Sequence, residues 1–177
     1  SFTHNTAQYI TVYNSSFINN GFKGIYAELL SDAVFDGVVV TGNGKYAYWN
    51  GDFNAGVDIN LKAGAYQNLV FRNMTVTDNG MGAKHGAGLL VKARDDGSYV
   101  SPNSATLTNV SIEGGVFSGN ERGIVIGEPG KNNNGPTGVQ IHNASITGNV
   151  KTYGPSDGSV YGGLINQSKA PVNAEYN

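Results

Sequence analysis

The sequence predicts an all-β fold, a right-handed parallel β-helix (a solenoid) of about five rungs, where a rung is one turn of the solenoid. Three observations lead to this prediction. A seven-residue phrase returns five times, short runs between the phrases have the two-residue period of β-strands, and the composition is rich in turn-forming residues. Parallel crossover connections are right-handed in nearly all proteins, so we expect the solenoid to wind in that sense.

The repeated phrase opens with asparagine or glycine, has an apolar residue at its fourth position and ends in asparagine. Its copies are Asn14–Asn20, Gly37–Asn43, Asn73–Asn79, Gly114–Asn120 and Asn143–Asn149. The final asparagines are 23, 36, 41 and 29 residues apart, so a constant unit recurs with variable spacers, as in stacked repeats. We expect the final asparagine to tolerate a left-handed backbone and to hydrogen-bond along the stack. The apolar residues expected to stack inside are Phe17, Val40, Val76, Phe117 and Ile146.

Short runs between the phrases alternate apolar and other residues, as strands with one buried face do. In their shared register, the residues that point inward are Ile25, Ala27, Val57, Ile59, Leu89, Val91, Ile124 and Ile126. The outward residues form one column of Tyr26, Asp58 and Leu90, and a second of Glu28, Asn60 and Lys92, with Arg94 just beyond. A β-sandwich also has short strands and many turns, but it gives no reason for one phrase to recur.

The composition excludes several classes of protein. The net charge is −2 and no basic run occurs, which argues against a nucleic-acid partner. No apolar stretch reaches membrane-spanning length, so we expect no membrane partner. The absence of cysteine excludes disulfides and thiolate metal sites, and it is compatible with a secreted or cell-surface bacterial protein, the location we expect. We expect no metal or other cofactor, because no histidine pair has metal-site spacing and Asp95-Asp96 is only a weak calcium signal.

The domain organisation follows from where the strand pattern stops. We expect residues 1–167 to form the β-helix and residues 168–177, which lack strand periodicity, to be a cover over the last rung or a linker. The chain begins at Ser1, without a signal peptide or a cap for the first rung. We therefore expect it to be a mature or trimmed piece of a longer protein.

The outward columns predict a binding surface. Rungs lie about 4.8 Å apart, so side chains in neighbouring rungs touch. An aromatic insertion at residues 45–54 adds apolar surface that could meet a sugar ring. The predicted substrate-binding residues are Glu28, Asp58, Asn60, Lys84, Tyr46, Tyr48 and Trp49. The alternative is a solvated outer face whose charges have no function.

Two stretches, Asn20–Phe35 and Asn109–Val125, resemble rungs of the pectate-lyase-like superfamily, and most closely the β-helix modules of secreted mannuronan C5-epimerases. The resemblance implies a polysaccharide partner, an acidic one if the likeness extends to function. The family's Asp-Pro-His-Glu signature keeps only its histidine here, as His4, and Lys84-His85-Gly86 is comparable to the family's Arg-His-Gly one rung late.

Three hypotheses for function remain open. A uronan-modifying enzyme, an epimerase or a lyase, needs a group that neutralises the carboxylate, a base and an acid. For these roles the sequence offers Lys92 or Arg94 as the neutralising cation, His85 as the base and Tyr26 as the acid. The second hypothesis is a non-catalytic carbohydrate-binding or adhesive solenoid. The third is a structural spacer in a surface or phage-tail protein.

Overall fold

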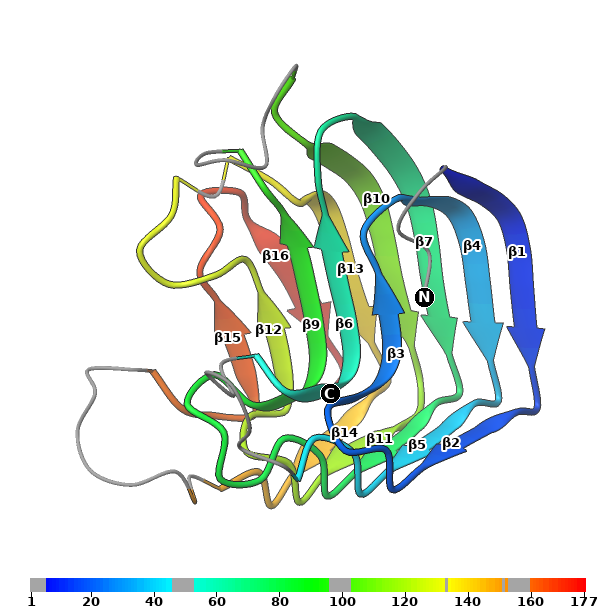
Figure 1. The fold of residues 1–177 in the computed structure, drawn as a ribbon, viewed down its shortest axis with the longest axis vertical. Helices are drawn as coiled ribbons and strands as arrows, with labels where there is room; N and C mark the ends of the chain where they lie inside the picture. Colours follow the sequence, from blue (N-terminus) through cyan, green and yellow to red (C-terminus); the bar gives the residue numbers. More distant parts are fainter. Residues whose placement is uncertain (1–5, 46–52, 96–102, 133, 151, 153–159) are drawn as a thin grey trace.

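The computed structural model describes residues 6–45, 53–95, 103–132, 134–150, 152 and 160–177. The fold is a right-handed parallel β-helix of about five rungs, which confirms the predicted class (Figure 1). Every strand pair is parallel, and each full rung contributes one strand to each of three sheets. Within the described part of the chain, no helix is long and apolar enough to cross a membrane.

The three sheets are named here by their order within a rung. The first sheet consists of β1 (Ala7–Tyr13), β4 (Leu30–Asp36), β7 (Ala65–Arg72), β10 (Thr106–Glu113), β13 (Thr137–His142) and β16 (Val172–Glu175). The second sheet consists of β2 (Ser16–Ile18), β5 (Val39–Thr41), β8 (Thr75–Thr77), β11 (Val116–Ser118) and β14 (Ser145–Thr147). The third sheet consists of β3 (Lys23–Ala27), β6 (Ala55–Leu61), β9 (Ala87–Ala93), β12 (Ile124–Ile126) and β15 (Leu164–Asn166). In Figure 1 the short second sheet joins the other two along the bottom of the view.

The core is a narrow column of stacked apolar side chains, as the phrase predicts. Val40, Val76 and Phe117 face one another across rungs and are fully buried, whereas Phe17 and Ile146, in the end rungs, are partly buried. The inward set predicted for the third sheet is buried throughout. These findings confirm the predicted register, and a slip of one residue would have turned every one of these side chains to the opposite face.

The final asparagines of the phrases form a continuous hydrogen-bonded ladder inside the solenoid. The Oδ1 atom of Asn79 accepts bonds from the backbone N and from Nδ2 of Asn43, both at 2.9 Å. Nδ2 of Asn79 in turn donates to Asn120 Oδ1 and to the Val40 carbonyl, each at 2.9 Å. The ladder runs from Asn20 to Asn149. A primary amide suits this position because it carries both donors and acceptors, so the predicted hydrogen bonding along the stack is confirmed.

The prediction of a left-handed backbone at the final asparagine is wrong. Within the phrases, a left-handed backbone instead occurs at the first and sixth positions of every copy, and also at Gly115. The residues at the first and sixth positions frame the three-residue strand of the phrase. The first-position residues are Asn14, Gly37, Asn73, Gly114 and Asn143, with φ between 44° and 64°. The sixth-position residues are Asn19, Gly42, Asp78, Gly119 and Gly148, with φ between 56° and 67°. The Asn, Asp and Gly at these two positions are the residues that tolerate this conformation best, which explains the polar corners of the phrase.

Glycine at the start of the third-sheet strands is explained by the ladder. A Cβ atom on Gly56 would lie 2.8 Å from Asn79 Cγ, and one on Gly88 would lie 2.8 Å from Asn120 Cγ. Only a residue without a side chain lets these strands pass so close to the asparagines.

The C-terminal segment continues the solenoid. Within residues 168–177, which we expected to be a cover or a linker, β16 pairs in parallel with β13 and adds a sixth strand to the first sheet. Asn177 then donates from Nδ2 to the Ile141 carbonyl at 2.8 Å and accepts from the Ala144 backbone N at 2.9 Å. The strand repeat therefore extends beyond residue 167.

Replacing Phe117 by alanine should lower the free energy of unfolding by about 3–5 kcal/mol, because the side chain is fully buried in a core with little freedom to collapse. Chemical denaturation measures the loss. An unchanged midpoint would contradict the packing described here.

Asn79→Ala should cost about 3 kcal/mol or more, because it leaves Asn43 N, Asn43 Nδ2 and the Val40 carbonyl without their buried partner. Thr75→Ala, on the exposed side of the same phrase, is the matched control and should change stability by less than about 0.5 kcal/mol. Equal effects of the two substitutions in urea denaturation would refute the role given to the ladder.

Candidate functional site

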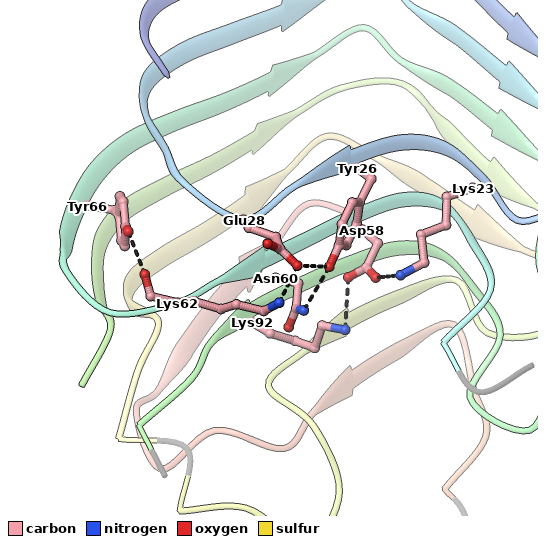
Figure 2. A network of polar contacts seen from close by, with 8 residues as sticks. All are labelled: Lys23, Tyr26, Glu28, Asp58, Asn60, Lys62, Tyr66 and Lys92. Carbon is pink, nitrogen blue, oxygen red and sulfur yellow. Dashed lines mark hydrogen bonds and ion pairs between the residues drawn. The ribbon is translucent and has the colours of Figure 1, made fainter. Parts of the chain in front are cut away.

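The candidate site lies on the outer face of the third sheet. Strand pairing places Tyr26 opposite Asp58 and Asp58 opposite Leu90. In the next column Asn60 lies opposite Lys92. The two outward columns predicted from the sequence therefore exist, and Figure 2 shows their polar side chains converging. What the sequence does not reveal is how these side chains pair with one another.

Asp58 lies between two lysines and is completely buried. Lys23 Nζ lies 2.5 Å from Oδ2 of Asp58, and Lys92 Nζ lies 2.9 Å from Oδ1 (Figure 2). The Lys92 side chain is only 3% exposed, whereas that of Lys23 is 24% exposed. The Phe53 ring also covers Lys92, with Nζ 4.2 Å from the ring centroid. Asp58 and Lys92 therefore form a dry ion pair between β6 and β9.

Tyr26, Glu28 and Lys62 form a second, more open group. The Tyr26 hydroxyl and the Lys62 ammonium both donate to Oε1 of Glu28, and Asn60 Nδ2 donates to the Tyr26 hydroxyl at 3.3 Å (Figure 2). Tyr26 is half-buried, and the side chains of Glu28 and Lys62 are 17% and 20% exposed. Lys23 Nζ also lies 4.2 Å from the centre of the Tyr26 ring, which connects this group to Asp58.

The environment shifts the acid–base behaviour of three of these side chains. Burial, with the hydrogen bond to Glu28, raises the pKa of Tyr26 above its ordinary value of 10.0. Burial pushes the pKa of Glu28 upward, but the hydrogen bonds from Lys62 and Tyr26 outweigh it and hold this pKa below its ordinary value. Burial lowers the pKa of Lys92, against the attraction of Asp58. At neutral pH Tyr26 is therefore a proton donor, and Glu28 is ionised.

The C-terminal part of the same face is apolar. Ala55, Ala87, Leu90, Val125 and Ile165 form a second hydrophobic cluster, separate from the core, and Phe53 packs on it. Polar and apolar surfaces thus lie side by side on one sheet, with Phe53 in contact with both.

The other predicted site residues lie around this group. His85 stacks on Phe53, with ring centroids 4.7 Å apart and an interplanar angle of 28°. Arg94 Nε lies 3.3 Å from Glu128 Oε1, and the Lys84 carbonyl accepts a bond from Arg122 Nη2 at 2.9 Å. The structure thus brings together five of the predicted site residues: Tyr26, Glu28, Asp58, Asn60 and Lys92. The contacts given above for His85, Lys84 and Arg94 are instead with Phe53, Arg122 and Glu128. Tyr46, Tyr48 and Trp49 lie outside the described residues.

Sequence reasoning missed Lys23 and Lys62, and although Phe53 belongs to the predicted aromatic insertion, its cover of Lys92 was not predicted. Lys62 follows Asp58 and Asn60 at the same two-residue spacing, so the alternation of outward and inward side chains alone could have identified it. Lys23 lies two residues before Ile25, so the alternation would place its side chain inward. Only the pairing at the start of β3 reveals its contact with Asp58. Sequence reasoning also missed the buried Glu121, which accepts hydrogen bonds from the Gly82 and Thr152 backbone N atoms and thereby links two positions far apart in the sequence.

Neither the geometry nor the comparisons assign the site to a known class. Over the described ranges, no group of three or more histidine or acidic side chains could hold a metal ion. No family model matches the chain, and no curated protein or solved structure matches it.

The depressed pKa of Glu28 predicts a pH dependence of stability. A carboxyl group with a lowered folded-state pKa stabilises the protein above its unfolded pKa, and this contribution is lost as the pH falls through the folded value. Between about pH 6 and pH 3 the parent should therefore lose more stability than Glu28→Gln does. Urea denaturation at the two pH values measures this difference. An equal loss in both proteins would show that Glu28 makes no such contribution.

Proposed function

We propose that this chain binds a polysaccharide, preferentially an acidic one, on the outer face of the third sheet and outside the cell. The observation that carries the proposal is the partly exposed group of Tyr26, Glu28 and Lys62, in which a phenol, a carboxylate and an ammonium lie within hydrogen-bonding reach of one another. Sugars are recognised by such combinations, because aromatic faces cover their C–H surfaces while polar groups bind their hydroxyls.

The charges of the site support an acidic ligand. Asp58 and Lys92 together carry no net charge, so Lys23 and Lys62 face the single remaining carboxylate, that of Glu28, which leaves one positive charge unmatched. The two lysines that water reaches are Lys23 and Lys62, so we assign contact with an anionic group to them. The sequence suggested Lys92 or Arg94 for this role, but their charges lie beside Asp58 and Glu128 and are little exposed.

A second candidate is a uronan-modifying activity, of the epimerase or lyase type found in the pectate-lyase-like superfamily. It is favoured by Tyr26, whose raised pKa keeps the phenol protonated and able to donate a proton. In this mechanism Lys62 would neutralise the substrate carboxylate and His85 would remain the candidate base. Tyr26 would deliver a proton to the sugar carbon or to the leaving oxygen.

The test is a panel of acidic and neutral polysaccharides. Binding is measured by calorimetry, double-bond formation by ultraviolet absorbance, and inversion at C5 by proton NMR. We expect binding to acidic polymers that weakens with added salt. Lys62→Met should weaken it about tenfold. Lys169→Met removes an exposed lysine from the C-terminal segment and is the matched control. Equal affinities of the two variants would place the ligand elsewhere.

Tyr26→Phe separates the two candidate functions. The substitution keeps the aromatic ring and removes the proton donor. A binding module should retain most of its affinity for the polymer, whereas an enzyme should bind the polymer and no longer convert it. Absence of binding to every polymer in the panel would instead favour a structural solenoid.

A further inference from the structure

The dry ion pair of Asp58 and Lys92 has no part in the proposed ligand contacts. The two side chains come from adjacent rungs, on β6 and β9, and approach within 2.9 Å. Asp58 is 0% exposed and the Lys92 side chain is 3% exposed. An ion pair in such a place is costly, because the desolvation of both charges offsets their attraction.

We infer that Lys92 and Asp58 condense to form an isopeptide bond, an amide that links β6 covalently to β9. The product is a neutral group in place of two buried charges, so burial itself favours it. The fold holds the amine 2.9 Å from the carboxyl group, which raises their effective concentration far above any that free reactants reach.

The reaction balances without an outside reagent. A proton passes from Lys92 Nζ to Oδ1 of Asp58, which leaves a neutral amine and a neutral carboxylic acid. The nitrogen lone pair then attacks Cγ and forms the C–N bond. Oδ1 leaves as water, carrying the transferred proton and a second proton from the nitrogen, while Oδ2 remains as the carbonyl oxygen of the amide.

The surroundings of the pair supply what this reaction needs. Lys23 Nζ lies 2.5 Å from Oδ2, where negative charge develops as the nitrogen attacks, so its ammonium stabilises the intermediate. The Phe53 ring lies over Lys92 Nζ, and its cover keeps water away from the amine.

The other ion pairs of the network lack one of these conditions. The side chains of Lys23 and Lys62 are 24% and 20% exposed, so water reaches their nitrogen atoms, unlike that of Lys92. The inference therefore concerns Lys92 alone, and the pair of Lys62 with Glu28 is an internal control.

Mass spectrometry of the denatured 177-residue chain tests the inference. The expected mass is lower by one water molecule than the mass calculated from the sequence. Trypsin should release a branched peptide that joins residues 46–62, which contain Asp58, to residues 85–94, which contain an uncleaved Lys92. The full calculated mass in the parent protein would overturn the inference. A one-water deficit with these two peptides separate, as a succinimide at an Asp-Gly step would produce, would also overturn it.

Two variants complete the test. Lys92→Arg keeps a cation beside Asp58 but has no amine to acylate, so it should have the full mass and no branched peptide. Lys62→Arg makes the same change at the partly exposed pair, and it should retain both the deficit and the branched peptide. A deficit that persists in Lys92→Arg would overturn the inference. If that variant does not fold, the mass of the parent protein still decides.

Discussion

The asparagine ladder is the interaction on which the rest of this solenoid depends. A β-helix places a sharp corner in every rung, and backbone groups at a buried corner must find hydrogen-bond partners. Each buried asparagine binds the backbone N and the amide of the rung before it, and also a carbonyl of the preceding phrase, such as that of Val40 or Val76. One side chain per rung thus satisfies several groups that the strands leave unpaired. The phrase recurs because this requirement recurs.

The ladder also determines where the third sheet lies. The second residue of β6 and of β9 is glycine because Gly56 and Gly88 pass directly beside Asn79 and Asn120. With the start of each strand fixed, alternation along β6 decides that Val57 and Ile59 enter the core while Asp58 and Asn60 face outward. The position of the candidate site is therefore a consequence of the corner that precedes it. The spacers, which vary in length, leave this register unchanged.

The fold and the register could be predicted from the sequence because both follow from local periodicity. The repeated phrase indicated the stacking, and the two-residue period placed Tyr26 and Asp58 in one column. The left-handed positions were misassigned because both Asn and Gly occur at several places in the phrase, and composition alone does not distinguish them. The contact of Lys23 with Asp58 and the cover of Lys92 by Phe53 depend on tertiary packing, which no local pattern encodes.

Burial divides the polar groups of the third sheet into two kinds with different chemistry. Asp58 and Lys92 contact each other, the Phe53 ring covers Lys92, and both side chains are closed to solvent, so only an intramolecular change could use them. Tyr26, Glu28 and Lys62 are paired but partly exposed, and a ligand can exchange their mutual hydrogen bonds for its own. Breaking a dry pair leaves a buried charge uncompensated, whereas opening a partly wet one costs little. The partly exposed group is therefore where an external ligand meets the lower barrier, even though Asp58 and Lys92 are residues of the same chemical kinds.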